Sequence, residues 1–232
     1  MNKIVRKIRA TIRWILVAFL GSTILAVVAF RFVPVFFTPL MFIRCYQQIS
    51  EGRDLKLRHQ WVSIDHISPS MPVAVIASED ANFMKHHGFD YKAIENAAKR
   101  NMKHPEKRKL GASTISQQTA KNVFLWPGRS WIRKGFEVYF TALIEILWSK
   151  ERIMEVYLNS IEMGEGIYGV EAVAEEHFRT NAKSLSKSQC ALIAATLPNP
   201  RKFSSKSPSS YMLKRQARIL KEMKFVSAFP AK

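Results

Sequence analysis

The acidic pair Glu79 and Asp80 ends an apolar run and is a candidate for proton-transfer chemistry. The run starts at Pro72, which suits the beginning of a helix, and its apolar residues follow the i, i+3, i+4 spacing of a buried helix face. A carboxylate at the end of such a helix is held beside apolar surface, a setting that suits a general base. The alternative is a solvent-facing pair that closes a surface helix, and this stretch alone does not decide between the two.

A second polar cluster follows in the segment GASTISQQTAKN, residues 111–122. Thr114, Gln117, Gln118 and Lys121 have the i, i+3, i+4 and i+7 spacing of adjoining helical faces. They are therefore predicted to form a hydrogen-bonding wall that carries one cation. Arg129 comes directly after a Pro-Gly turn, which can aim its side chain back at this wall.

Arg133 and Glu137 stand one helical turn apart in the next segment. At this spacing a surface ion pair contributes only about 0.3–0.5 kcal/mol, and taken alone the spacing favours such a pair over a functional one. The segment from Trp131 to Trp148 is predicted to be a long core helix. Its apolar stripe consists of Ile132, Phe136, Phe140, Leu143 and Leu147.

The other segments also favour helices, and strand signals are weak, so we expect a mainly α fold. Residues 101–110 read as a polar, Lys-rich loop. The further predicted helices are residues 90–102 with Asp90 as cap, residues 111–124, a helix that runs from a Ser186/Gln189 capping box to near Pro198, and a last helix opened by Ser207-Pro208.

The N-terminal residues predict a retained membrane anchor. The first thirteen residues contain Lys and Arg but no acid, and the 17 residues from Trp14 to Phe30 carry no charge before Arg31. A span needs about 17–25 apolar residues, whereas the apolar region of a cleaved signal peptide has about 7–15 and a small-residue cleavage site, which is missing after Arg31. Because basic flanks stay on the cytoplasmic side, the rest of the chain is expected outside the inner membrane, in the periplasm. Residues 33–43, interrupted by two prolines, are expected in the membrane interface or packed on the body.

The charge and the cysteine content limit the kinds of partner and of structural bond that the protein can have. The net charge is +18, and all 18 acids lie beyond residue 31, with 30 of the 36 Lys and Arg residues, so the body carries a net +12. A basic surface beside a membrane attracts anionic lipid headgroups, and a domain outside the membrane rarely meets nucleic acid. With only Cys45 and Cys190 present, no disulfide framework is expected, and no cluster of ligand-type residues indicates a structural metal.

Taken together, the motifs resemble those of the monofunctional biosynthetic peptidoglycan glycosyltransferases, whose domain also forms the front half of bifunctional penicillin-binding proteins. Five motifs occur in order over about 100 residues, and the resemblance covers nearly the whole body. They are ED-x-x-F-x-x-H-x-G at Glu79, Asp80, Phe83, His86 and Gly88; G-x-S-T-I-x-Q-Q-x-x-K-N at residues 111–122; R-K-x-x-E at Arg133, Lys134 and Glu137; K-x-x-I-L-E-x-Y-L-N at residues 150–159, with Met154 for leucine; and a glycine-rich motif at residues 164–178, with His177 where tyrosine is expected.

The resemblance implies a lysozyme-like domain with two lobes, a head and a jaw, behind a single N-terminal transmembrane helix. It also implies polymerisation of lipid II into β-1,4 glycan strands with loss of undecaprenyl pyrophosphate. By motif position Glu79 is the general base, Glu137 an assisting carboxylate, and Lys121 and Arg129 the pyrophosphate clamp. The residues implied to line the cleft are Ser113, Gln117, Gln118 and Arg133.

The expected organisation is a cytoplasmic basic segment over residues 1–13, a transmembrane helix over 14–30, a membrane-proximal linker over 31–60 and the glycosyltransferase domain over 61–232. The expected partners are lipid II, the nascent glycan strand, membrane lipids and proteins of cell-wall synthesis and division, with no nucleic acid. A divalent cation, Mg²⁺ or Mn²⁺, is compatible with a pyrophosphate site, although no ligand cluster demands it.

Two alternatives belong to other classes of protein. A glycan-cleaving muramidase or lytic transglycosylase needs an acid beside a polymer cleft but no cationic clamp, so Lys121 and Arg129 argue against it. A non-catalytic membrane adaptor would use its basic face and dispense with Glu79. A transpeptidase is not expected, because the SxxK segment at residues 184–187 begins a capped helix and too few residues follow for such a domain.

Overall fold

The computed structural model describes residues 3–107, 109–128 and 130–229, so Arg129 lies outside the described residues. The chain separates into two compact units, one up to Pro34 and one from Val35 onward. The expected linker, residues 31–60, contains a helix and a short strand of the second unit.

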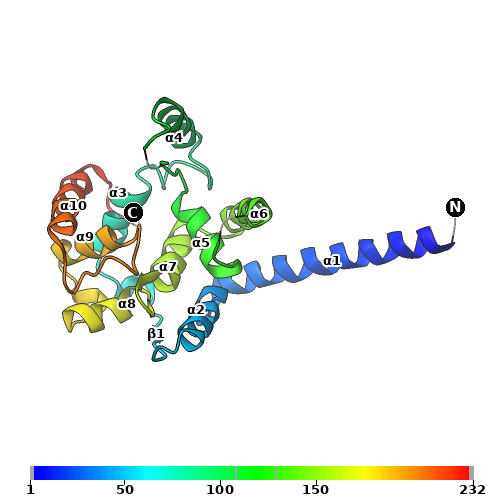
Figure 1. Ribbon diagram of the computed structural model, residues 1–232, viewed down its shortest axis with the longest axis horizontal. Coiled ribbons are helices and arrows are strands. Elements are labelled where there is room, and N and C mark those ends of the chain that lie inside the picture. Colours follow the sequence, from blue (N-terminus) through cyan, green and yellow to red (C-terminus); the bar gives the residue numbers. More distant parts are fainter. Residues whose placement is uncertain (1–2, 108, 129, 230–232) are drawn as a thin grey trace. The chain divides into compact units, whose positions relative to one another are not determined.

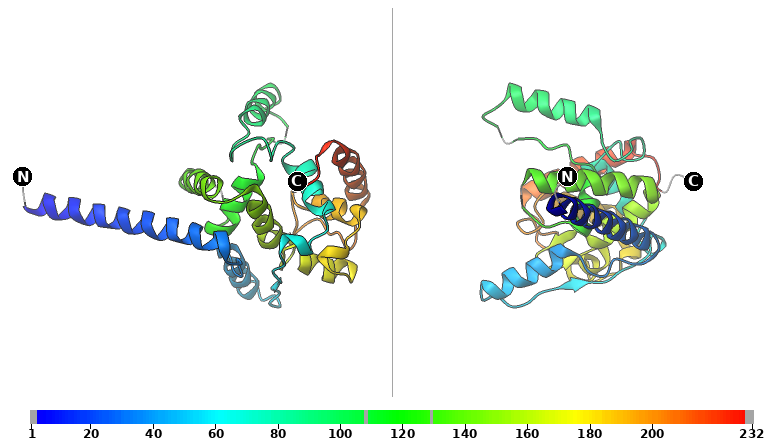
Figure 2. Two further views of the ribbon diagram at one scale, coloured as in Figure 1. Left: turned by 180° about the vertical axis from the view of Figure 1, so that it is seen from behind. Right: turned by 90° about the vertical axis from the view of Figure 1, so that its right-hand side faces the viewer.

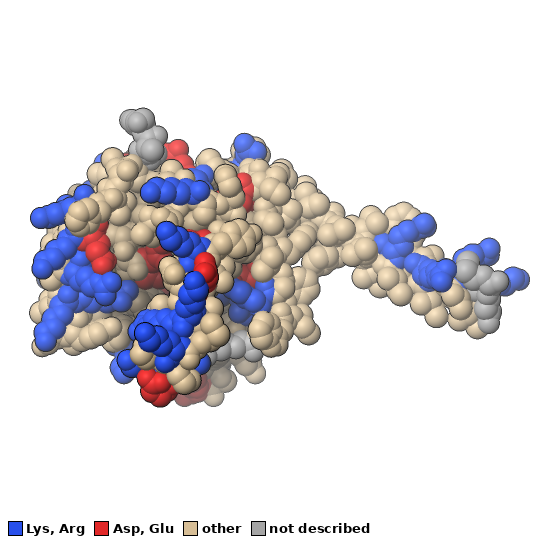
Figure 3. Space-filling view, turned by 90° about the horizontal axis from the view of Figure 1, so that it is seen from above, with Lys and Arg blue, Asp and Glu red and all other residues tan. Residues whose placement is uncertain are grey.

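The first unit consists of the helix α1 (Lys3–Phe32), whose length and composition suffice to cross a membrane. The predicted span from Trp14 to Phe30 lies within it. In Figure 3 the Lys and Arg side chains of α1 gather at its beginning, and an uncharged stretch follows them. This distribution is consistent with a membrane anchor that has a basic flank.

The second unit is mainly helical, as the sequence predicts (Figure 1). Its α-helices are α2 (Pro39–Ser50), α3 (Ser70–Glu79), α4 (Tyr91–Lys103), α5 (Ile115–Phe124), α6 (Trp131–Leu147), α7 (Lys150–Ser160), α8 (Val170–Val173), α9 (Lys187–Thr196) and α10 (Ser210–Glu222). Its strands are β1 (Arg58–His59), β2 (Glu162–Gly164) and β3 (Ile167–Tyr168). They form a small sheet in the order β1-β3-β2, with β1 parallel and β2 antiparallel to β3, which the weak strand signals in the sequence did not predict.

Two groups of helices build the body. Helices α3, α9 and α10 pack on one another, and so do α5, α6 and α7 (Figure 1 and Figure 2). Helix α9 is buried from Cys190 to Thr196, which is expected of a helix that is apolar on all sides. The capping box predicted for α9 is present, because Ser186 and Gln189 exchange side-chain to backbone hydrogen bonds.

A buried aspartate joins the two groups. Asp80 follows the last residue of α3, and its Oδ2 accepts a 3.0 Å hydrogen bond from the backbone N–H of Ile115 at the first turn of α5. His86 Nε2 lies 2.9 Å from Oδ1 of the same carboxylate. Thr114 Oγ1 adds a 2.6 Å hydrogen bond to the carbonyl of Gly88. The loop after α3 is thereby fixed to the beginning of α5, and Glu79 is held against that helix.

The predicted core stripe of α6 is confirmed only in part. Phe140 is buried, and Phe136, Leu143 and Leu147 are half-buried. Ile132 is exposed, however, and the buried face also includes Arg133, Glu137 and Ile144. The apolar spacing fitted a helix, but it did not show that the buried face would begin with an ion pair. Tertiary packing overrides the apolar pattern because this end of α6 borders a polar cavity.

Several predicted helix limits also shift. The apolar run of α3 begins at Ser70, so Pro72 is its third residue, and Ala74 and Val75 are among its buried residues. Residues 111–114 precede α5 and are not helical, and the last helix is capped by Ser209. Side-chain caps set two of these limits, with Thr114 at α5 and Ser209 at α10.

Gly88 occupies a position that a side chain would disturb. Its φ is +87°, and an added Cβ would lie 2.8 Å from Thr141 Cγ2 and 3.0 Å from Glu145 Cγ, both on α6. The glycine therefore permits a left-handed turn and a close approach of the Asp80 loop to α6.

We predict that Gly88→Ala lowers the free energy of unfolding by at least about 1 kcal/mol, because the left-handed backbone and the contact with Thr141 both oppose a Cβ. Thermal unfolding of the full chain in detergent, followed by circular dichroism, measures the effect. Gly135→Ala is the matched control, since Gly135 lies within α6 and its Cβ would meet nothing within 4 Å. There alanine should be neutral or stabilising. Equal melting temperatures for both variants would contradict the prediction.

Candidate functional site

Glu79 ends α3 and faces a cavity of about 900 Å³. Its side chain is 15% exposed. Ser78 Oγ donates to Glu79 Oε1 at 3.1 Å, and Gln118 Nε2 donates to Oε2 at 3.3 Å. Arg215 Nη2 lies 3.6 Å from Oε1. The two acids therefore differ in their surroundings: Asp80 is fixed by hydrogen bonds in the protein interior, and Glu79 faces the cavity.

The larger cavity mixes carboxylates with cations from separate segments. Its wall includes Arg100 from α4, Lys109 from the following loop, and Arg215 and Arg218 from α10. A polar ligand with anionic groups fits such a wall, because each cation can provide a charge-assisted hydrogen bond.

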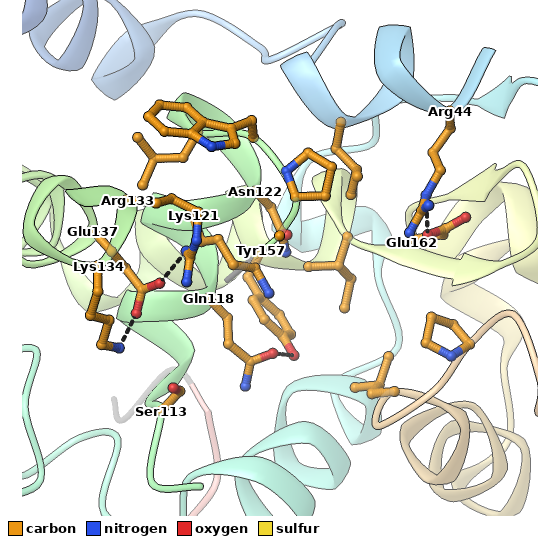
Figure 4. Close-up of a pocket in the computed structure, with 18 of the residues that line it drawn as sticks. Arg44, Ser113, Gln118, Lys121, Asn122, Arg133, Lys134, Glu137, Tyr157 and Glu162 are labelled. Carbon is orange, nitrogen blue, oxygen red and sulfur yellow. Dashed lines mark hydrogen bonds and ion pairs between the residues drawn. The ribbon is translucent and has the colours of Figure 1, made fainter. Parts of the chain in front are cut away.

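A second cavity of about 490 Å³ adjoins the first, since Ser113, Gln118 and Pro198 line both. Figure 4 shows Lys121, Arg133, Lys134 and Glu137 gathered on one side of this second cavity. The ion pair between Arg44 and Glu162, with 3.4 Å between Nε and Oε2, lies on the opposite side (Figure 4).

Glu137 is buried, with 3% of its surface exposed. Arg133 Nη1 donates a 2.7 Å hydrogen bond to its Oε2, and Lys134 Nζ pairs with its Oε1. The pair with Arg133 is therefore not the surface pair that the spacing alone favoured. A buried ion pair is weak evidence for stability because desolvation opposes it, so its place in a cavity wall favours a functional reading.

Burial lowers the pKa of Lys121, and the neighbouring cations Arg133 and Lys134 act in the same direction, while Glu137 opposes them. Three cations thus surround one carboxylate at this side of the second cavity. An anion bound here would gain from all three and would relieve their mutual repulsion. The second cavity is suited to a phosphate-like group.

A hydrogen-bonded chain links the two cavities. Tyr157 is fully buried, and its Oη donates to Gln118 Oε1 at 3.3 Å. Desolvation raises the pKa of Tyr157 well above its ordinary value, and the nearby Glu79 and Asp80 add to the shift, so the hydroxyl keeps its proton. Because Oε1 of Gln118 accepts from Tyr157, its amide N–H₂ is turned toward Glu79.

The structure brings most of the predicted site residues together. Glu79, Ser113 and Gln118 meet at the larger cavity, and Ser113 and Gln118 join Lys121, Arg133 and Glu137 at the smaller one. Gln117 is placed differently: its Oε1 accepts from the backbone N–H of Thr114 and closes the cap of α5, and within the described ranges it lines neither cavity. Arg129 cannot be placed, because it lies outside the described residues.

Sequence reasoning missed Tyr157 and Arg215 as site residues. Tyr157 lies in the fourth motif, so the motif itself could have indicated it. Arg215 belongs to no motif, and its approach to Glu79 depends on how α10 packs against α3. In the part of the chain that the structure covers, no group of three or more His, Cys, Asp or Glu residues is arranged to hold a metal ion.

Comparison with known proteins identifies the family of this chain. The family model described as "Transglycosylase" matches residues 47–224. A protein of Bacteroides thetaiotaomicron named "Biosynthetic peptidoglycan transglycosylase" is 62% identical over 226 residues, which cover 97% of this chain and 90% of the relative. Proteins with the same name from Bdellovibrio bacteriovorus and Pseudomonas syringae are 53% and 46% identical, over 90% and 97% of this chain and 84% and 92% of the relatives. With a family match that spans most of the body and relatives this similar along nearly the whole chain, the protein belongs to the transglycosylase family.

Proposed function

We propose that this protein polymerises lipid II into the β-1,4-linked glycan strands of peptidoglycan and releases undecaprenyl pyrophosphate. The observation that carries the proposal is the junction of two cavities at Ser113 and Gln118, one with a carboxylate and the other with a group of cations. The names of the relatives support the same activity.

The reaction needs one proton acceptor and one anion-stabilising group. The 4-hydroxyl of the acceptor sugar attacks the anomeric carbon of the donor, and its proton passes to a carboxylate. The bond from that carbon to the pyrophosphate oxygen breaks, and the electron pair leaves with the pyrophosphate. Because the donor is α-linked and the product β-linked, the step inverts the anomeric carbon.

Glu79 is the better candidate for the general base. Its two oxygens receive hydrogen bonds from neutral groups, Ser78 and Gln118, and it borders the larger cavity. Both oxygens of Glu137 are already engaged by cations, Arg133 and Lys134, so neither is free to meet an acceptor hydroxyl. We assign to Glu137 the task of holding Arg133 and Lys134 at the second cavity.

Lys121, with Arg133 and Lys134, is proposed to stabilise the departing pyrophosphate. Negative charge grows on that group as the bond breaks, so fixed cations lower the barrier more than they aid substrate binding. Arg129 remains a predicted member of this cation group, and a divalent cation at the pyrophosphate site also remains a prediction.

The substrate's lipid tail fits a protein with an N-terminal apolar helix. We propose that α1 is a single transmembrane anchor in the cytoplasmic membrane, with its basic end in the cytoplasm and the body in the periplasm. Membrane lipids and proteins of cell-wall synthesis and division are the further partners we expect.

Glu79→Gln is predicted to lower turnover about 100- to 10,000-fold while leaving the fold intact, because an amide cannot take the proton. Glycan formation from labelled lipid II by the full chain in detergent, with lysozyme digestion of the product, measures it. Glu95→Gln is the matched control, since it makes the same substitution at an exposed position of α4. A folded Glu79→Gln variant with near wild-type turnover would remove Glu79 as the base.

Lys121→Ala is predicted to lower kcat about 100-fold, with a smaller change in KM, because the cation acts mainly on the leaving group. A lipid II titration separates the two constants. Lys99→Ala, which removes an exposed lysine of α4, is the control. A raised KM with an unchanged kcat would place Lys121 in ground-state binding instead.

The pH dependence offers a second readout for Lys121. Its lowered pKa means that it loses its proton, and with it the positive charge, at a lower pH than an ordinary lysine. On the alkaline side kcat/KM should therefore fall as the pH rises through that pKa. Arginine stays charged there, so an active Lys121→Arg variant should keep its kcat/KM to higher pH.

Glu137→Gln is predicted to lower both turnover and stability. The neutral amide leaves Arg133 buried without its ion pair, which costs about 1–3 kcal/mol, and frees Lys134 to move. Melting temperature and turnover of the same preparation test both parts. A wild-type melting temperature together with wild-type turnover would show that the Arg133–Glu137 pair contributes to neither stability nor activity.

A further inference from the structure

An arginine from the C-terminal helix reaches the end of α3. Arg215 Nη2 donates a 3.1 Å hydrogen bond to Ser78 Oγ and lies 3.6 Å from Glu79 Oε1. Ser78 Oγ in turn donates to the same oxygen of Glu79 at 3.1 Å. The guanidinium therefore acts on Oε1 both directly and through the serine hydroxyl.

The opposite oxygen of Glu79 is held from another helix. Gln118 Nε2 on α5 donates to Oε2, and Tyr157 on α7 orients that amide. The carboxylate thus lies between a neutral donor on one side and a cation-backed donor on the other. A group held on both sides keeps one orientation, which a general base needs to meet the hydroxyl proton.

Glu79 requires such support because of its place in α3. It is the last residue of a ten-residue helix, where the partial negative charge of the helix end repels a carboxylate. A nearby cation offsets this repulsion. Among the described residues, Arg215 is the cation for which the structure gives an ion pair with Glu79.

We propose that Arg215 is a positioning residue for Glu79, holding Oε1 together with Ser78 so that the carboxylate points into the larger cavity. The inference rests on the proposed role of Glu79 as general base. Arg215 itself touches neither the acceptor hydroxyl nor the leaving group in this assignment.

The neighbouring cations of α10 behave differently. Arg218 also lines the larger cavity, but its Nε pairs with Glu222 Oε1 at 2.7 Å on an exposed part of the helix. Lys214 is exposed and outside the residues that line either cavity. The side chain of Arg215 is only 27% exposed and points to the end of α3. General attraction of an anionic substrate by α10 can therefore be separated from a specific action on Glu79.

The test compares Arg215→Met, Arg215→Lys and Lys214→Met in the full chain, by titration of labelled lipid II in detergent. Arg215→Met is expected to lower kcat about 10- to 100-fold with KM within about threefold of wild type, since a misplaced base slows the reaction without weakening binding. Arg215→Lys should restore part of kcat, because a cation remains. Lys214→Met removes the same charge from the same helix and should match wild type.

A raised KM with unchanged kcat in Arg215→Met would overturn the proposal and make Arg215 a substrate-binding cation. An equal loss in Lys214→Met would overturn it as well. Ser78→Ala, which removes the hydroxyl link and keeps Arg215, provides a second route if Arg215→Met fails to fold. Wild-type kcat in both Ser78→Ala and a folded Arg215→Lys variant would then reject the proposal.

The Glu79→Gln variant distinguishes a failure of Glu79 as the general base from a failure of the role proposed for Arg215. If it is inactive and Arg215→Met is fully active, Glu79 remains the base and only the role of Arg215 fails. If Glu79→Gln is itself active, the assignment of the base fails first.

Discussion

The carboxylate of Asp80 joins the end of α3 to the beginning of α5, and the site depends on this junction. It receives the backbone N–H of Ile115 on one oxygen and contacts His86 with both. Because Asp80 is buried, these bonds are strong and their loss would leave an unpaired charge in the interior. The junction fixes the distance between Glu79, on the last residue of α3, and Gln118, one turn into α5. In the proposed assignment, Asp80 therefore has a structural role and Glu79 a chemical one.

The fold also places the proposed general base and the proposed pyrophosphate-stabilising cations at different cavities. Glu79 and its neutral donors face one cavity, while Lys121, Arg133 and Lys134 face the other. The larger cavity has cations of its own, and one of them, Arg215, pairs with Glu79. At the smaller cavity Glu137 pairs with Arg133 and Lys134 and holds both in the wall. Gln118 and Ser113 stand at the boundary, where the two reacting sugars must meet in the proposed reaction.

Helix α10 adds a contact from the far end of the chain. It packs on α9 and α3, so Arg215 is delivered to Glu79 by two helices that are themselves held by apolar contacts. Met212 and Ile219 are buried on the face of α10 that makes this packing. The orientation of a polar group at the site is thus set by burial elsewhere, which is how a rigid core commonly preorganises a catalytic centre.

The sequence alone determined the helical class, the apolar N-terminal helix and the family, because these are carried by local spacing and by motifs. It also indicated six residues that line the cavities, namely Glu79, Ser113, Gln118, Lys121, Arg133 and Glu137. It did not determine that the buried face of α6 begins with Arg133 and Glu137, since apolar periodicity favoured Ile132 at this end. Nor did it separate Gln117, which caps α5, from Gln118, which reaches Glu79: adjacent residues on a helix point in different directions, and only the neighbouring helices decide which direction is the cavity. Arg215 lies more than 130 residues from Glu79 in sequence, so no local pattern could pair them. Their contact is decided by the tertiary packing of α10 on α3. The spacing of Met212 and Ile219 indicates a buried face of α10, but no local pattern shows which helix that face meets.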